Sequence, residues 1–491
     1  MLQSHPLPSP KLEASTLTME SDSDVLILGI GEDDRGKASL DSAGVLPTKW
    51  VDHIMQRGLV SAKLGEINRL VSPSTDGPSL IVCVGVGNAL DRTRDRAFDL
   101  TATAIRSIHT KEQRVVHVAL ANCYEKEMHD SIVAGSLNAC ENQSIYQVAP
   151  KEFVPETIRF SGIDDHAIER GRIIGESMIY LRRLVNEPPS EVYPESFSAK
   201  ATEIANASGL SIEVWDENRL EAEGCRAILA VGAGSSKPPR LVIMRHNGGK
   251  AEPPIALVGK GVTFDSGGLS LKPSEAMADM KCDMAGAATV VGLMSAISRL
   301  GIKRNVIGLC GLAENMVSGT SYKLGDVIET RSGKTIEILN TDAEGRVVLA
   351  DTLNVANDSK PSAMIDLATL TGACMVALGT EVAGLMTNNQ SLCDSVSEAA
   401  KEEGEPVWQL PMFELYDEKV KSKVADIKNV GEGRWGGAIT AAKFLENFVD
   451  ATPWVHIDIA GPSFVDSAKP HRDAGATGVM LRSLLRWVET P

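Results

Sequence analysis

The stretch IALVGKG (255–261) has the composition of a strand buried on both faces, because its apolar residues run without polar alternation. Comparable runs stand at LVIMRH (241–246), NVIGLCGLAEN (305–315), AMIDLATLTG (363–372) and WVHIDIAG (454–461). Helix-like segments separate these runs, an alternation that is typical of a mostly parallel sheet covered on both faces. The second half of the chain is therefore predicted to form an α/β domain.

A shorter series of the same kind precedes it. The runs are DVLILGIG (24–31), SLIVCVGVG (79–87) and VVHVALANC (115–123), and a helix-like segment, RAFDLTATAIRSI, lies at 96–108. The predicted fold class is thus α/β with two domains, each a mostly parallel sheet flanked by helices. Three Gly-rich stretches lack the full phosphate-binding patterns and are predicted to be ordinary strand-to-helix turns. They are GIGEDD (29–34), GVGNAL (85–90) and GAGSSKPP (232–239).

The segment DDHAIERGRIIGESMIYLRRLVNEPP (164–189) connects the two series. Its apolar residues recur at helical spacing and Pro188-Pro189 ends the pattern, so we predict a connecting helix. The first residues of the chain contain Pro, Ser and mixed charge without an apolar block, which predicts a disordered leader and no secretory signal. The predicted organisation is a leader (1–20), an N-terminal α/β domain (21–160), the connecting helix (161–189) and a C-terminal domain (190–491).

Bulk composition narrows the classes of function. Acidic residues outnumber basic ones by 65 to 49, and the net charge of −16 argues against binding nucleic acid over the whole surface. The sequence has no apolar run of the roughly 18 residues that a membrane-spanning helix needs. Its eight cysteines are scattered without a CxxC pair, as in a reducing compartment. We therefore predict a cytoplasmic protein without a membrane partner.

Polar side chains gather after the predicted strands of the C-terminal domain. Loops that follow parallel strands converge on one crevice, so residues there are candidates for a shared site. The candidates are Lys260, Asp265, Lys272 and Asp283 after IALVG, Asp342, Glu344 and Arg346 after GKTIEILN, and Thr369 and Gly372 after AMIDLA.

Four acids in one crevice need compensation, because like charges at close range raise one another's pKa. Either the acids face water separately, or cations hold them together. Gly267, Gly268 and Gly345 permit tight turns beside two of the acids. Asp283 directly precedes a helix predicted over 284–300, so its alternative role is that of a helix N-cap. The oxygen donors suit Mg, Mn or Zn. The residues alone therefore leave two alternatives, a metal-dependent hydrolase and a set of separate surface acids.

The motif NTDAEGR (340–346) resembles the hallmark of the leucine aminopeptidase family of two-metal exopeptidases. Further blocks are similar to those of the family and follow in the same order. They are LVNEPPSEVYP (184–194), VGKGVTFDSGGLSLK (258–272), MKCDMAGAAT (280–289), AENMVSGTSYKLGDVI (313–328), IDLATLTGACMVALG (365–379), KNVGEGRWGGAITAAKFL (428–445) and WVHIDIAGPSF (454–464). The resemblance implies that the C-terminal domain is a catalytic metallopeptidase domain.

Carried over to this sequence, the resemblance implies a site for two divalent cations, Mn²⁺ or Zn²⁺, in each subunit. Asp265 and Glu344 would bridge the two ions. Lys260 and Asp283 would complete one coordination sphere, and Asp342 would complete the other. Lys260 would bind as a neutral amine, a protonation state that an adjacent dication makes accessible near neutral pH.

The family pattern also implies a catalytic pair and a substrate pocket. Lys272 would be the electrophile that stabilises the developing oxyanion, and Arg346 would hold a bicarbonate-type proton shuttle. The expected activity is the release of leucine or other neutral or hydrophobic residues from the N-termini of peptides, by a homohexamer. The pocket residues implied are Met280, Asn340, Thr369, Leu370 and Gly372.

Some positions depart from the commoner family pattern. Cys225 and Arg226 stand where Met and Gly are frequent, Val317 replaces a frequent Pro, and Lys323-Leu324 replace Arg-Pro. These departures concern loops and leave the polar site residues unchanged. Two other functions are kept as alternatives. One is a metal-dependent dipeptidase restricted to substrates such as Cys-Gly, and the other is a DNA-binding role, against which the net charge of −16 argues.

Overall fold

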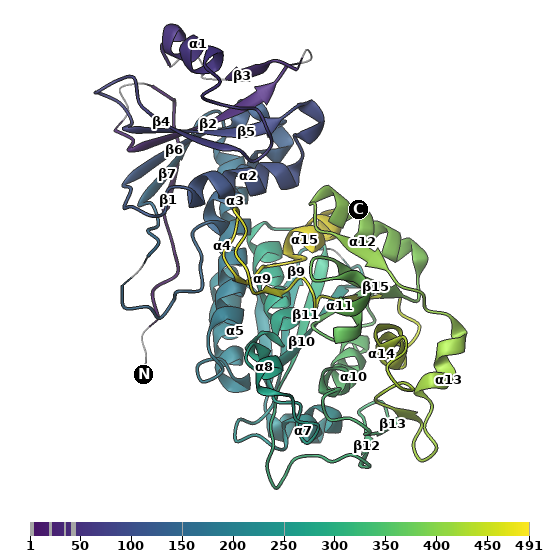
Figure 1. The fold of residues 1–491 in the computed structure, drawn as a ribbon. Helices are drawn as coiled ribbons and strands as arrows, with labels where there is room; N and C mark the ends of the chain where they lie inside the picture. The colour runs from purple at the N-terminus through teal and green to yellow at the C-terminus, as the bar shows by residue number, and fades with distance from the viewer. Residues whose placement is uncertain are drawn as a thin grey trace. The chain divides into compact units, whose positions relative to one another are not determined.

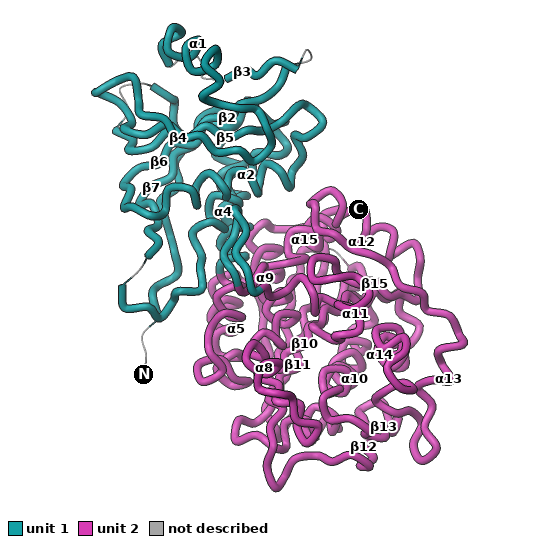
Figure 2. The backbone as a smooth tube through the Cα atoms, in the orientation of Figure 1, with its two compact units in different colours: residues 1–179, 466–474 teal, residues 180–465, 475–491 magenta. Residues whose placement is uncertain are grey.

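The computed structural model describes residues 4–18, 22–33, 36–40, 46–149, 151–249 and 251–490. The chain divides into two compact units, which Figure 2 shows in different colours. Unit 1 comprises residues 1–179 and 466–474, and unit 2 comprises residues 180–465 and 475–491. Helix α4 (Asp165–Asn186) lies in the predicted connecting segment and contributes residues to both units.

Unit 1 is built on a mostly parallel sheet with the strand order β1-β7-β6-β2-β5-β4, and β3 pairs with β2. Its strands are β1 (Lys11–Ala14), β2 (Val25–Glu32), β3 (Ala38–Leu40), β4 (Ile67–Val71), β5 (Leu80–Gly87), β6 (Val115–Ala119) and β7 (Thr157–Phe160). Its helices besides α4 are α1 (Thr48–Gln56), α2 (Arg94–Arg106) and α3 (His129–Asn138). The strands β2 and β5 are buried along almost their whole length, as their continuous apolar sequences predict.

The prediction of a disordered leader is wrong at residues 11–14, which form β1. This strand pairs in parallel with β7, and Leu12 packs against the core of unit 1. Leu17, later in the same segment, is only 8% exposed. Burial of these two apolar side chains stabilises an ordered segment. Residues 1–3 and 19–20 of the predicted leader lie outside the described residues.

Only one of the three Gly-rich stretches is the predicted strand-to-helix turn. GVGNAL (85–90) leads from β5 towards α2. The stretch that begins at Gly29 instead enters the antiparallel pairing of β2 with β3, and the stretch at 232–239 leads from a helix into a strand. A β-carbon at Gly29 would lie 2.3 Å from Cys123 Sγ. This glycine therefore makes room for a packed side chain.

Unit 2 contains an eight-stranded mixed sheet with the order β16-β15-β18-β14-β10-β11-β9-β8. Its strands are β8 (Ser211–Trp215), β9 (Arg240–Asn247), β10 (Ile255–Asp265), β11 (Asn305–Asn315), β14 (Ala363–Ala368), β15 (Ala383–Thr387), β16 (Val407–Gln409) and β18 (Trp454–Asp458). The central pairs β18–β14, β14–β10 and β10–β11 are parallel, whereas the pairs β11–β9, β9–β8 and β15–β18 are antiparallel. The predicted α/β class with two parallel-rich sheets is confirmed.

Two small sheets complete the strands of unit 2. One has the order β12-β13-β17, from β12 (Val327–Glu329), β13 (Thr335–Glu337) and β17 (Ile427–Lys428), and the other pairs β19 (Phe464–Val465) with β20 (Gly475–Ala476). The helices are α5 (Pro194–Ser208), α6 (Glu217–Ala222), α7 (Arg226–Gly232), α8 (Ser274–Met277), α9 (Ala285–Arg299), α10 (Glu344–Asn357), α11 (Gly372–Leu378), α12 (Gln390–Glu402), α13 (Asp417–Val420), α14 (Gly437–Glu446) and α15 (Leu481–Glu489).

Helices α9 and α10 cover opposite faces of the eight-stranded sheet (Figure 1). Gly308 of β11 faces α9, because a β-carbon there would lie 2.7 Å from Met294. Gly311 of the same strand faces α10, because its β-carbon would lie 2.2 Å from Thr352 Oγ1. These glycines are an odd number of positions apart, so they point to opposite faces of the sheet. Both helices can therefore pack closely on the same strand.

The segment Ser274–Arg299, which includes α9, contains an 18-residue window with a mean hydropathy of 1.2, so it is long and apolar enough for a membrane span by length and composition. However, 89% of its most apolar window is buried inside the fold. It packs against α5 and α15 as well as the sheet. Its apolar composition is thus accounted for by its place in the core.

Strand β10 carries a β-bulge between Val262 and Phe264 that decides where its polar residues point. Lys260 and Asp265 are an odd number of positions apart, so a regular strand would place them on opposite faces. The bulge adds one residue to β10 relative to β11. Lys260 consequently pairs with Gly311 and Asp265 with Asn315, positions that share one face of β11. Both polar residues therefore face the α10 side.

Candidate active site

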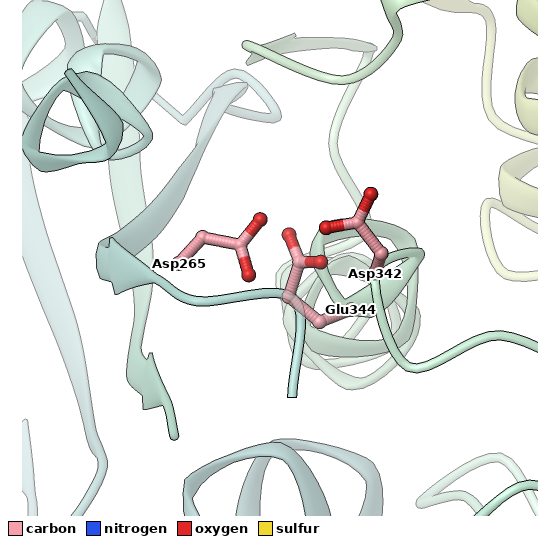
Figure 3. Close-up of side chains that lie close together, drawn as sticks. All are labelled: Asp265, Asp342 and Glu344. Atoms are coloured by element: carbon pink, nitrogen blue, oxygen red, sulfur yellow. The ribbon is translucent and has the colours of Figure 1, made fainter. Parts of the chain in front are cut away.

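Three carboxylates converge at the end of β10. Asp265 is the last residue of that strand, Asp342 lies in the turn before α10, and Glu344 is the first residue of α10. One oxygen from each acid lies within 4.8 Å of the other two, and Figure 3 shows the carboxyl groups close together. Asp265 and Glu344 are buried, whereas the Asp342 side chain is 34% exposed. The cluster therefore opens to solvent on the Asp342 side.

Asp283 joins this cluster through Lys260. The Lys260 Nζ lies 2.7 Å from Asp283 Oδ2 and 3.0 Å from Glu344 Oε1. Thr369 Oγ1 donates a hydrogen bond to Asp283 Oδ1 at 2.7 Å. A β-carbon at Gly345 would lie 2.3 Å from Lys260 Cε. Gly345 is therefore not a turn glycine as predicted: it lies within α10 and lets the lysine approach the helix.

Lys272 reaches the cluster from the loop that follows β10. Gly267 and Gly268 have φ values of 84° and 60°, in the left-handed region that glycine favours, so the predicted tight turn is confirmed. The loop places Lys272 Nζ 2.9 Å from Asp265 Oδ2 and 2.5 Å from Asp342 Oδ1. A second lysine thus lies between two of the acids, at the exposed side of the cluster.

Two acids reach the site differently from the sequence prediction. Asp342 and Glu344 do not follow a strand of the main sheet, because the preceding strand β13 belongs to the small β12-β13-β17 sheet. They reach the site because α10 packs on β10 and β11.

Asp283 does not cap α9, which has no side-chain cap hydrogen bond. Its carboxylate instead accepts hydrogen bonds from Lys260 and Thr369.

The charges of this cluster favour binding of a cation. Burial raises the pKa of Asp265, Asp283 and Asp342 above the ordinary range of aspartate. Burial works to lower the pKa of Lys260, but the charges of Asp283 and Glu344 outweigh it and raise that pKa. Two lysines face four acids in this space, so part of the negative charge is left without a partner.

The donors present fit divalent cations. Glu344 Oε2 is buried and accepts no hydrogen bond among the residues that the structure describes. Buried polar atoms are normally paired, so this oxygen is available to a ligand. Carboxylate oxygens suit ions such as Mn²⁺ and Zn²⁺, and the Lys260 amine can add a nitrogen donor. The predicted ligands Lys260, Asp265, Asp283, Asp342 and Glu344 lie in one connected cluster.

Arg346 lies beneath the cluster in the first turn of α10. Its side chain is buried, and Nη1 donates to the main-chain oxygen of Asn429 at 2.9 Å. Its Nε is buried and makes no hydrogen bond within the described part of the chain. Burial lowers the pKa of Arg346 to about 10, so the guanidinium keeps its charge at neutral pH. A buried cation with a free donor is suited to bind a small anion.

The residues predicted to form the substrate pocket lie on two sides of this cluster. Thr369 and Leu370 lie in the turn between β14 and α11, and Gly372 is the first residue of α11. Thr369 reaches the site through its bond to Asp283. Asn340 Oδ1 accepts from the main-chain nitrogen of Asp342 at 2.8 Å and so shapes the turn before α10. Met280 begins the short 3-10 helix Met280–Cys282 that leads to Asp283, and its side chain is partly exposed.

Sequence patterns did not identify three residues that hold the site together. Asn315 Nδ2 donates to Asp265 Oδ1 at 2.8 Å and to Thr341 O at 2.9 Å. Asn429 Nδ2 donates to Asn340 O at 2.6 Å, and the main-chain oxygen of Asn429 accepts from Arg346 Nη1. Asp458 accepts hydrogen bonds from Leu370 N and Thr371 Oγ1 in the β14–α11 turn. A sequence signal existed for Asn315 in the polar end of NVIGLCGLAEN, where Glu314 and Asn315 close a largely apolar strand.

Comparison with known proteins places both parts of the chain in one family. Residues 179–485 match the catalytic domain of the cytosol aminopeptidase family, and residues 25–147 match its N-terminal domain. A probable cytosol aminopeptidase of Rhodopirellula baltica is 60% identical over 99% of both chains. One from Geobacter sulfurreducens is 40% identical over 89% of this chain and 92% of its own.

Solved structures agree with this assignment. A mutant of tomato leucine aminopeptidase is 30% identical, with a TM-score of 0.87 over 100% of this chain and 99% of its own. The bottromycin maturation enzyme BotP in complex with Mn is 33% identical, with a TM-score of 0.84 over 95% of this chain and 99% of its own. With the carboxylate cluster and its fit to divalent ions, these likenesses define the enzyme class. The chain belongs to the cytosol aminopeptidase family and is a metal-dependent exopeptidase.

Proposed function

We propose that the enzyme releases leucine and other neutral or hydrophobic residues from peptide N-termini in the cytoplasm. The observation that carries the proposal is the convergence of Asp265, Asp342 and Glu344 with two lysines at one end of β10. An exopeptidase must recognise a free α-amine. A cation held by this cluster can bind that amine, so no dedicated acidic residue is needed. The printed name of the tomato relative, a leucine aminopeptidase, supports the preference for leucine.

Two divalent cations, Mn²⁺ or Zn²⁺, are proposed as cofactors. Asp265, Asp342 and Glu344, together with Lys260 and Asp283, would hold them. Bound ions of this kind lower the pKa of water and polarise the scissile carbonyl. The Mn complex of BotP supports the choice of manganese.

Lys272 and Arg346 are proposed as the catalytic pair. Lys272 Nζ is held at the open side of the cluster by two acids, where its charge can stabilise the oxyanion that forms on the substrate carbonyl. Arg346, whose buried Nε makes no hydrogen bond to any residue that the structure describes, would hold a bicarbonate-type anion. Such an anion would supply general acid–base chemistry beside the cluster. Thr369, Leu370 and Gly372, with Met280 and Asn340, would line the pocket for the first substrate residue.

Hydrolysis of a leucyl amide is expected to require a divalent cation. Treatment with a chelator followed by dialysis should remove the activity, and Mn²⁺ or Zn²⁺ should restore it, because the cluster supplies carboxylates but no histidine nucleophile or base. Release of free leucine is the measurement. Activity that survives metal removal would contradict the proposal, and cleavage confined to Cys-Gly in a dipeptide panel would favour the narrower dipeptidase.

A homohexamer is proposed as the working assembly. Support comes from large apolar side chains that are exposed in the single chain: Trp408 at 66%, Phe413 at 61%, Leu415 at 60% and Trp435 at 74%. Exposed aromatic groups of this size are enriched in subunit interfaces. Sedimentation is expected to give six times the chain mass of 52.4 kDa. A stable monomer at micromolar concentration would refute this assembly.

A further inference from the structure

One peptide group beside the site is held at both ends. Thr369 O accepts a hydrogen bond from Lys260 Nζ at 3.0 Å, and Leu370 N donates one to Asp458 Oδ1 at 3.1 Å. The two atoms belong to the same peptide unit. A trans peptide directs its C=O and N–H to opposite sides. This unit therefore extends from the Asp458 carboxylate to the Lys260 amine.

Asp458 holds the rest of the turn as well. It is the last residue of β18 and is fully buried, at 0% exposure. Thr371 Oγ1 donates to its Oδ2 at 2.7 Å, and Ala460 N donates to its Oδ1 at 3.1 Å. Thr371 Oγ1 also accepts from Cys374 N at 3.0 Å, which caps α11. A buried acid with this many donors fixes the main chain of the β14–α11 turn.

We propose that Asp458 is a positioning residue for the metal ligand Lys260, and that it acts through the Thr369–Leu370 peptide. The inference rests on the proposed function, in which Lys260 binds an ion as a neutral amine. Such an amine has two hydrogens and one lone pair. When Thr369 O accepts one hydrogen, the directions left for the lone pair are restricted. The Asp458 carboxylate thus helps to decide where Lys260 can coordinate.

The flexibility of lysine makes this support necessary. The Lys260 side chain has four rotatable bonds, and burying such a chain in one conformation costs rotamer entropy. Partners that orient a metal ligand typically contribute about 10-fold to 100-fold to metal affinity. We expect Asp458 to have an effect of this size. Because Leu370 lies in the same turn, loss of the carboxylate should also raise the KM for leucyl substrates.

Asp366 offers a matched control. It is likewise a fully buried acid, on the neighbouring strand β14, where it pairs in register with His456. Its oxygens accept hydrogen bonds of 2.7 Å from Trp454 Nε1 and His456 Nδ1. Neither partner belongs to the β14–α11 turn. A change at Asp366 therefore disturbs the same region of the core without touching the peptide that contacts Lys260.

The test compares Asp458→Asn with Asp366→Asn in the full chain. Mn²⁺ affinity is measured by competition with a chromophoric chelator, without any substrate. We expect Asp458→Asn to weaken Mn²⁺ binding at one of the two sites by about 10-fold to 100-fold. Asp366→Asn should lower the melting temperature but leave both affinities within about twofold of the original, as for a change outside the ligand shell.

Thr371 provides a second pair of variants should Asp458→Asn fail to fold. Thr371→Val removes the hydroxyl that donates to Asp458, whereas Thr371→Ser keeps it. Weaker Mn²⁺ binding in the valine variant and unchanged binding in the serine variant would support the inference. Unchanged Mn²⁺ affinity in both Asp458→Asn and Thr371→Val would overturn it and leave the aminopeptidase proposal intact. An unsubstituted enzyme that cleaves no peptide would instead refute the proposed function.

Discussion

Glu344→Gln is expected to reduce leucyl amide hydrolysis by well over the roughly 100-fold that is typical of groups supporting a metal ligand from outside its coordination sphere. Glu344 is buried, and its Oε1 lies 3.0 Å from Lys260 Nζ, whereas its Oε2 has no hydrogen-bond partner among the described residues. Glutamine keeps the shape but replaces one oxygen with an amide donor and removes the negative charge that would hold cations in the proposed site. Initial rates at saturating Mn²⁺ and the metal content per chain measure the two effects.

Glu337→Gln is the control for this change. Glu337 lies on β13, shortly before the site, and its carboxylate contacts Ser422 and not the carboxylate cluster. The control should keep its metal content and its rate. A Glu344→Gln enzyme with two bound ions and ordinary turnover would show that Glu344 does not bridge the ions.

Lys272→Met should lower kcat by about 10²-fold to 10³-fold, the loss typical of removing one group that stabilises an oxyanion. Methionine keeps much of the side-chain length but has no charge. Metal binding should persist or tighten, because the lysine cation no longer competes for Asp265 and Asp342, which lie 2.9 Å and 2.5 Å from its Nζ. Steady-state kinetics on a leucyl amide and on a longer peptide, together with chelator competition, measure both quantities.

Lys323→Met serves as the comparison for Lys272→Met. The Lys323 side chain is 65% exposed, and its Nζ forms an ion pair with Asp326 at 3.5 Å. This partner is not one of the acids of the cluster. It should leave both kcat and metal affinity unchanged. If Lys272→Met lost its metals instead of its turnover number, the lysine would be a structural counter-ion and not the electrophile.

The strands and helices around the site were predictable because local patterns determine them. The run at 305–315 coincides with β11, and the helix expected at 284–300 is α9 with one residue less at each end. Continuous apolar runs signal strands covered on both faces, and this signal survives whatever the tertiary context. The strand expected at 255–261 is too short, since β10 continues to Asp265. A strand end with polar residues looks like a loop in sequence.

The arrangement of the site was less predictable, because it depends on contacts between distant segments. The residues alone left Asp283 open as a helix cap, and only the resemblance to a family assigned it to the metal site. Asn315 and Asn429 act through hydrogen bonds to residues far along the chain. Hydrogen-bond partners that lie far apart in the chain leave no periodic pattern in the sequence. The placement of Asp342 after a strand of a minor sheet has the same cause.

The extra residue in β10 has a consequence for how this segment can change. Substitutions at Val262 or Phe264 that keep the bulge alter only side-chain volume, whereas a change that straightened the bulge without removing a residue would leave Lys260 and Asp265 an odd number of pleat positions apart and turn Asp265 towards α9. The acid would then lie across the sheet from Glu344. The bulge between Lys260 and Asp265 is thus under as strict a constraint as any side chain of the site, because it sets the face on which Asp265 lies.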